Sequence, residues 1–174
     1  MTEGSEKTFK GRTSIVTIKG SYAIKAYREK TKRKNFEKEY LILKAIEGYR
    51  IAPKGLKLAK DHIVLEYIEG KPLKDFYDSK EFPKILMLLV VRAAILDLLR
   101  INHNQLAYGR NVIVDKNNVP WIIDFEKASV FSKTMGKNVC QVLGFYSKFL
   151  DEKTKRKLVN LSKEWKKLLK SLYK

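Results

Sequence analysis

Lys25 places a cation inside an apolar stretch of the chain. The surrounding residues read "YAIKAY", with the small or apolar Ala23 and Ile24 directly before the lysine. An unpaired charge on a half-buried strand is costly, so a carboxylate partner is expected. Glu39, in the segment that follows, is the candidate, and Glu37 is the rival.

A second group of polar residues surrounds a predicted hairpin in "HNQLAYGRNVIVDKNNVPWIIDFEKAS", residues 103–129. Two β-branched runs flank the Asn-rich turn "DKNN". Asn111 begins the first run and Asp124 ends the second, thirteen positions later (residue 124 against residue 111). A hairpin of fixed length sets the separation of these two oxygen-bearing side chains. The plainer interpretation is that Asp124 caps a turn and Asn111 starts a strand.

The elements that would position these residues combine strands and helices. Alternation over residues 9–27, with glycine in the turn "KGS", predicts three strands, and "HIVLEYIEG" predicts another that ends at Gly70. Helical spacing predicts a helix over residues 34–48. Pro83 suits the first turn of a buried helix that includes residues 85–101. A last helix is predicted over residues 152–173, with an apolar stripe (Leu158, Leu161, Trp165, Leu168, Leu172) and a lysine-rich face.

Composition limits the classes of protein that need considering. The 174 residues, 44% of them hydrophobic, suit one compact domain. The single cysteine, Cys140, excludes an intramolecular disulfide. Residues 1–10 lack the apolar core of a signal peptide, and no run reaches the ~20 apolar residues of a membrane span. A soluble, cytoplasmic protein is therefore expected. The net charge of +18 would attract polyanions, although adaptation to heat also enriches charged surfaces.

Taken together, these motifs resemble the protein kinase superfamily, whose signatures include a strand lysine in V-A-I-K, a helix glutamate, a catalytic loop and D-F-G. "YAIK" is similar to the first motif, "IIDFEKAS" to the last, and "KGRTSIV" to the end of a glycine-rich loop. The chain most resembles the minimal archaeal serine/threonine kinase-like proteins, relatives of the RIO and lipopolysaccharide-kinase groups. The resemblance implies a compact, two-lobed α+β fold in a single domain over residues 1–174. A β-sheet lobe with one helix would occupy about residues 9–70, and a reduced, mainly helical lobe about residues 71–174.

The resemblance also implies ATP and Mg²⁺ as cofactors. Lys25 would bind the α- and β-phosphates, Glu39 would hold Lys25, and Asn111 and Asp124 would bind the metal. Gln105 and Arg110 would lie near the acceptor hydroxyl. The remaining residues that it places around the nucleotide are Gly11, Ser14, Val16, Ala23, Leu65, and the backbone of Glu66 and Ile68. Only small residues in the loop let backbone N–H groups approach phosphates closely.

Two departures from the kinase pattern bear on activity. Gln105 stands where kinases have a catalytic aspartate, and a neutral amide cannot accept a proton at any ordinary pH. Loss of a general base should cost on the order of 10²–10⁴ in rate, while positioning and charge stabilisation would remain. Glu126 replaces the glycine of D-F-G, which argues against a flip of that segment.

Two hypotheses of different kinds follow. The first is a kinase that phosphorylates a protein Ser or Thr hydroxyl, or itself, weakly because of Gln105. The second is a pseudokinase, a nucleotide-binding scaffold that docks on RNA, the ribosome or a protein partner through its basic surface. A plain nucleic-acid-binding protein is a third, supported by "KAYREKTKRK" and the lysine face of the last helix. For both charged stretches the plainer interpretation is a solvated surface.

Overall fold

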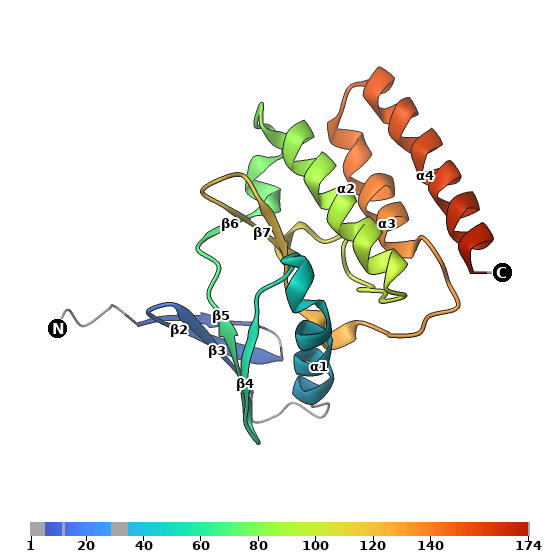
Figure 1. Ribbon diagram of the computed structural model, residues 1–174. Coiled ribbons are helices and arrows are strands. Elements are labelled where there is room, and N and C mark those ends of the chain that lie inside the picture. Colours follow the sequence, from blue (N-terminus) through green and yellow to red (C-terminus); the bar gives the residue numbers. More distant parts are fainter. Residues whose placement is uncertain (1–5, 12, 29–34, 174) are drawn as a thin grey trace. The chain divides into compact units, whose positions relative to one another are not determined.

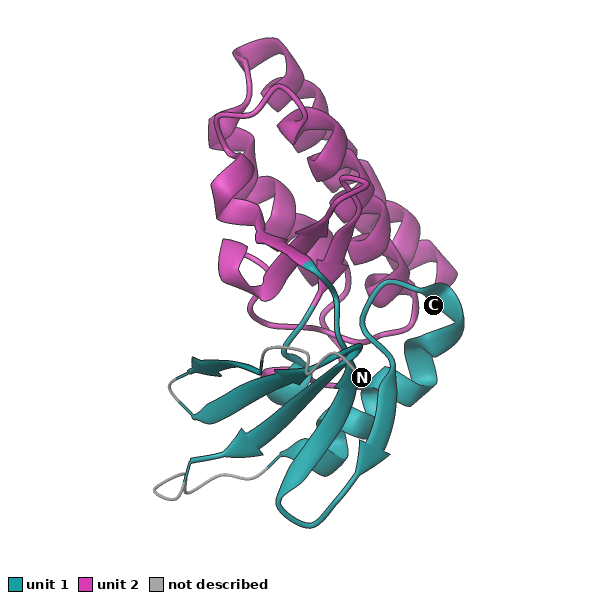
Figure 2. Cartoon of the chain, turned by 90° about the vertical axis from the view of Figure 1, so that its left-hand side faces the viewer, with its two compact units in different colours: residues 1–69, 123–126 teal, residues 70–122, 127–174 magenta. Residues whose placement is uncertain are grey.

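The computed structural model describes residues 6–11, 13–28 and 35–173 (Figure 1). Arg12 of the loop motif and residues 29–34 of the basic run lie outside the described part. The chain forms two compact units (Figure 2). Unit 1 contains residues 1–69 and 123–126, and unit 2 contains residues 70–122 and 127–174. The short segment 123–126 therefore groups with the N-terminal part of the chain, far from it in sequence.

Unit 1 is built on an antiparallel sheet of five strands in the order β1-β2-β3-β5-β4. The strands are β1 (Lys7–Lys10), β2 (Ser14–Lys19), β3 (Tyr22–Tyr27), β4 (Gly55–Leu58) and β5 (His62–Glu66). The three strands predicted over residues 9–27 are confirmed. Gly20 adopts a positive φ of 58° in the turn between β2 and β3, a conformation that glycine adopts without steric cost.

Helix α1 (Phe36–Ile46) packs against β4 and β5 in unit 1. It buries the apolar side chains of Phe36, Ile42, Leu43 and Ile46, together with one charged residue, Glu39. The helix predicted over residues 34–48 is thus present with slightly narrower bounds. Its buried face puts a carboxylate on the side of the helix that faces the interior of unit 1.

Unit 2 contains a second antiparallel sheet and three helices. Its sheet has the order β6-β7-β8, with β6 (Gly70–Pro72), β7 (Val112–Asp115) and β8 (Pro120–Ile122). The predicted hairpin around "DKNN" is confirmed, since β7 pairs with β8 from Val112 opposite Ile122. Its turn places Asn118 at a φ of 60°, which asparagine tolerates better than most residues.

The helices of unit 2 are α2 (Phe82–Leu98), α3 (Lys137–Tyr146) and α4 (Glu152–Leu172). Pro83 lies in the first turn of α2, as predicted. Helix α3 packs against both α2 and α4 (Figure 1). A buried carboxylate, Asp97 of α2, accepts hydrogen bonds from the backbone N–H groups of Asn138 and Val139 in the first turn of α3. The indole of Trp165 in α4 donates to the same carboxylate at 3.2 Å, so one side chain connects the three helices.

Some predictions about elements were wrong. The strand expected to end at Gly70 ends at Glu66, and Gly70–Pro72 form a separate strand, β6. The helix expected to be buried all round ends at Leu98 and exposes Met87, Leu88 and Val91. The last helix is confirmed as α4, but only Leu158 of its apolar stripe is buried, while Leu161, Leu168 and Leu172 are exposed. Apolar spacing shows which side chains share a face, but it does not show that another element covers that face.

Among the described residues, no helix has both the length and the apolar character that crossing a bilayer requires. The structure is α+β, as expected from the sequence.

Candidate functional site

Three charged side chains meet in unit 1. The ammonium group of Lys25 on β3 donates to Glu39 Oε2 at 2.8 Å and to Asp124 Oδ1 at 2.9 Å. Lys25 and Glu39 are buried, with side-chain exposures of 7% and 1%, while the Asp124 side chain is 38% exposed. The predicted pair of Lys25 and Glu39 is confirmed, and the rival Glu37 is exposed. We call Lys25, Glu39 and Asp124 the charged cluster.

The cluster keeps its lysine charged. Burial by itself lowers the pKa of Lys25, but the charges of Glu39 and Asp124 and their hydrogen bonds outweigh that effect and hold the pKa above its ordinary value. Burial raises the pKa of Glu39, and the neighbouring ammonium group opposes the rise. The result is a cation held between two carboxylates, one enclosed and one open to solvent.

The segment that carries Asp124 is fixed by its backbone as well as by its side chain. The backbone N–H of Phe125 donates to Glu39 Oε1 at 3.2 Å, so Glu39 binds both Lys25 and the residue after Asp124. Asp124 has a φ of 66°, in the left-handed region that non-glycine residues rarely adopt. Such conformations persist where the surroundings hold them, and they concentrate at functional sites.

The turn between β1 and β2 is closed by a backbone hydrogen bond from Gly11 to Ser14, 2.8 Å long. A Cβ on Gly11 would lie 3.2 Å from the Ser14 carbonyl oxygen, so the turn favours glycine at this position. Thr13 donates from its hydroxyl to Glu126 Oε2 at 3.3 Å. This bond connects the turn to the segment of Asp124, and neither Thr13 nor Glu126 was predicted to make it.

Strand register places five of the predicted nucleotide-site residues on one face of the sheet, and Ser14 joins this set because it lies two residues before Val16 on β2. Val16 lies opposite Lys25 across β2 and β3, and Ala23 lies opposite Leu65 across β3 and β5. Lys25 and Ala23 are two residues apart on one strand, so these side chains and that of Ser14 share a face. The backbone N–H of Glu66 donates to Lys54 O at 2.9 Å, so this predicted adenine-binding residue uses its N–H within unit 1. Ile68 is half-buried in the segment after β5.

The other three predicted site residues belong to unit 2. The side-chain N–H of Asn111 donates to the main-chain carbonyl of Gln105 at 3.1 Å, which orients the Asn111 amide and leaves its Oδ1 as the possible cation ligand. Arg110 is exposed, and its guanidinium lies 5.4 Å from the ring centre of Tyr108. Gly109 allows this loop to approach Lys74 and Tyr77, because a Cβ there would collide with the Tyr77 hydroxyl.

The ligand chemistry of the cluster fits a magnesium ion that is held mainly through phosphate. Within the described ranges, no group of three or more His, Cys, Asp or Glu side chains could hold a metal by itself. Mg²⁺ is usually bound by one or two carboxylates plus substrate phosphates rather than by a cage of protein ligands. Asp124 offers a partly exposed carboxylate beside a fixed ammonium group, which suits that mode of binding.

Comparisons with known proteins give no family for the chain. No protein-family model matches it, and a search of curated proteins finds no match.

Proposed function

We propose that this chain is a small ATP- and Mg²⁺-dependent phosphotransferase with a two-lobed, protein kinase-like fold. It transfers the γ-phosphate of ATP to a Ser or Thr hydroxyl of a protein, or to itself. The observation that carries the proposal is the charged cluster, in which one buried lysine binds a helix glutamate at 2.8 Å and the aspartate of the "IIDFE" motif at 2.9 Å. Lys25 and Asp124 are 99 positions apart in the sequence.

Each member of the cluster has a distinct role in this proposal. Lys25 binds phosphate oxygens and neutralises their charge, because its ammonium group stays protonated over the physiological pH range. Glu39 positions Lys25, and it also fixes the backbone after Asp124. Asp124 provides a carboxylate oxygen for Mg²⁺. Bound ATP would supply the phosphoryl group that is transferred.

The roles of the remaining residues rest on the sequence resemblance. Asn111 provides the second metal ligand, and Arg110 binds the transferring phosphate. Gln105 holds the acceptor hydroxyl by a hydrogen bond without removing its proton. Most of the acceleration of phosphoryl transfer comes from positioning and charge stabilisation, so a slow reaction remains possible without a general base.

Gln105 also favours a second candidate function. A chain that keeps the lysine, the metal ligands and the glycine turn but lacks the catalytic carboxylate is suited to bind ATP and Mg²⁺ without transfer. That protein would be a nucleotide-binding scaffold, docked on RNA, the ribosome or a protein partner.

One assay distinguishes the two functions. The purified chain is incubated with γ-labelled ATP and Mg²⁺ beside Lys25→Met and Asp124→Asn. Lys44→Met is the matched control, because Lys44 lies in α1, the helix of Glu39, and makes an exposed ion pair with Glu47 directly after that helix. A kinase labels itself or an added protein, loses the label in the first two variants and keeps it in the control. Labelling that survives in Lys25→Met and Asp124→Asn would contradict the proposal.

Two substitutions of Gln105 extend the assay. Because Asn111 binds the main-chain carbonyl of residue 105, Gln105→Asp keeps that hydrogen bond. We expect this variant to raise the transfer rate by up to about 10²-fold, as a restored general base would. Gln105→Asn, which has the same size without the charge, should leave the rate unchanged. Thermal stabilisation by ATP and Mg²⁺ without any transfer in either variant would favour the scaffold.

A further inference from the structure

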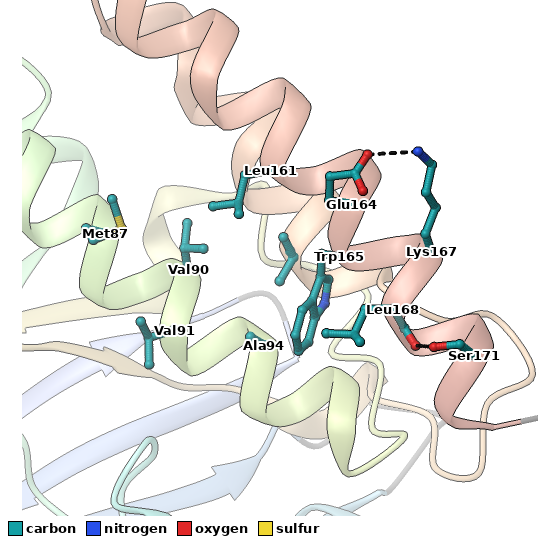
Figure 3. A pocket seen from close by; sticks show the side chains of 11 residues that line it. Met87, Val90, Val91, Ala94, Leu161, Glu164, Trp165, Lys167, Leu168 and Ser171 are labelled. Atoms are coloured by element: carbon teal, nitrogen blue, oxygen red, sulfur yellow. Dashed lines mark hydrogen bonds and ion pairs between the residues drawn. The ribbon is translucent and has the colours of Figure 1, made fainter.

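An apolar groove runs between α2 and α4 of unit 2 (Figure 3). Its volume is about 700 Å³, and α3 contributes Val139 to its lining. Figure 3 shows Val90 and Ala94 of α2 on the side of that helix nearer to Trp165, Leu161 and Leu168 of α4. Val91 also lines the groove. The groove is separate from the charged cluster, whose residues all belong to unit 1.

The walls of the groove expose large apolar side chains to solvent. Met87 and Val91 are 50% and 53% exposed, and Leu161 and Leu168 are each 48% exposed. Met87 and Val91 are four residues apart on one helix, and Leu161 and Leu168 are seven apart on the other. An amphipathic helix bound in a groove presents apolar side chains at positions i, i+4 and i+7, and the spacing of the exposed side chains on these two helices suits such a partner.

The floor of the groove is already rigid. Val90 and Val139 are buried, and Trp165 is held by its hydrogen bond to Asp97. A preformed surface avoids part of the ordering cost of association. Met87 adds a flexible apolar side chain that can adapt to different partners.

The two charged residues that line the groove pair with each other, so the net charge of α4 and of the whole chain decides which kind of occupant is attracted. Helix α4 carries eight Lys or Arg residues and two Glu residues, a net charge of +6. One of these glutamates, Glu164, is paired with Lys167 at 2.8 Å on the rim of the groove. The chain as a whole has a formal net charge of +18. A partner with acidic residues beside its apolar face would therefore be attracted, and a basic partner would be repelled.

We infer that the groove between α2 and α4 binds an amphipathic helix of an acidic protein partner, with the partner's apolar anchors against Val91, Leu161 and Leu168. A second copy of this chain is disfavoured as the occupant, because it would bring another +18 charge to the same surface. The groove is concave and is walled by two helices, a shape that suits an inserted helix better than a flat lipid surface.

Binding of designed peptides tests the inference. Three labelled helical peptides share leucines at i, i+4, i+7 and i+11 and differ only in carrying Glu, Gln or Lys at their polar positions. Fluorescence anisotropy with the full chain should show the Glu peptide binding at least about tenfold more tightly than the Lys peptide. Leu168→Glu should weaken binding of the Glu peptide by about tenfold or more.

Val159→Glu is the matched control. Val159 is an apolar residue of α4, 39% exposed and outside the groove lining, so this variant adds the same charge to the same helix. It should leave the affinity within about twofold of the unsubstituted chain, as surface contacts away from an interface contribute little. Equal weakening in the two variants, or no binding of the Glu peptide, would overturn the inference.

Two further measurements identify other occupants. Sedimentation velocity that shows a dimer lost in Leu168→Glu and kept in Val159→Glu would assign the groove to a second copy. Cosedimentation with phosphatidylserine vesicles that depends on Leu168, without binding of the Glu peptide, would assign it to a lipid surface. Either result would overturn the assignment to an acidic helix.

Discussion

At the scale of single residues, Lys25 has more partners than a surface lysine requires. Its ammonium group donates to two carboxylates, those of Glu39 and Asp124, and the backbone N–H of Phe125 donates to the other oxygen of Glu39. A buried ion pair adds little net stability compared with an apolar pair, but removing one partner leaves a buried charge uncompensated. The cluster is therefore not explained by a large net contribution to stability.

Removal of one partner of the buried ion pair should lower the stability of unit 1. We expect Glu39→Ala to destabilise unit 1 by about 3–5 kcal/mol, because Lys25 would lose its enclosed partner. The double variant Lys25→Met with Glu39→Leu, which removes both buried charges, should recover most of that loss. Hydrogen exchange of the α1 amides measures the effect in unit 1, and Glu47→Ala, in an exposed pair of the same helix region, should change it little. A double variant as unstable as Glu39→Ala would contradict the explanation.

The pairing of Lys25 with Glu39 could be predicted from the sequence, because a lysine in an apolar strand needs a carboxylate and the next helix offers one. The bond from Thr13 to Glu126 could not be predicted, since the two residues are 113 positions apart and neither belongs to a periodic pattern. The same holds for the contact of Lys25 with Asp124, which depends on how a distant segment folds back.

At the scale of elements, the hairpin of β7 and β8 is closed by a carboxylate. Asp115 accepts hydrogen bonds from the backbone N–H groups of Asn117 and Val119 and from the indole of Trp121, between 2.8 and 3.0 Å. Partial burial raises the pKa of Asp115, but these three bonds outweigh it and hold the pKa below its ordinary value of 3.8. Asp115 thus fixes the turn between Asn111 and Asp124.

This carboxylate predicts a dependence of stability on pH. Because the pKa of Asp115 is lower in the folded chain, its stabilising contribution is present above pH 3.8 and is lost as the pH falls through the folded value. Asp115→Asn should lower the free energy of unfolding of unit 2 by about 1 kcal/mol at pH 6, and the difference should shrink at acidic pH. Urea unfolding followed by tryptophan fluorescence reports on unit 2, which contains both tryptophans, Trp121 and Trp165.

The exposed Asp75 of unit 2 provides the control for that measurement. Asp75→Asn removes a carboxylate without removing the three hydrogen bonds, so its effect should be small and nearly independent of pH. If the difference between Asp115→Asn and the unsubstituted chain stayed constant from pH 6 to below pH 3.8, the assigned pKa direction would be wrong.

Elements with strong local signals were predictable, and two strands without β-branched residues were not. Alternation predicted β2 and β3, and the Asn-rich turn predicted the hairpin of β7 and β8. Strand β4 reads "GLKL" and β6 reads "GKP", and neither contains a β-branched residue. These two strands are specified by pairing with β5 and β7, which the sequence of each strand alone does not show.

At the scale of the whole molecule, the sequence correctly predicted an α+β chain, but it did not predict which unit one short segment belongs to. Residues 123–126 follow β8 of unit 2 in the sequence but group with unit 1. This grouping matters for the proposed chemistry. Lys25 and Asp124 belong to unit 1, whereas Asn111 and Gln105 belong to unit 2. The net charge of +18 also acts at this scale, since it favours anionic ligands at every site of the chain.

We propose that Lys25 binds the phosphates of a nucleoside triphosphate directly and that Asp124 binds them through magnesium. A crystal structure grown with Mg²⁺ and a non-hydrolysable ATP analogue tests it most directly. The account predicts phosphate oxygens within hydrogen-bonding distance of Lys25 Nζ, and one metal ion bound by both Asp124 and Asn111. Analogue bound elsewhere on the chain, or a metal ion that contacts neither Asp124 nor Asn111, would contradict it.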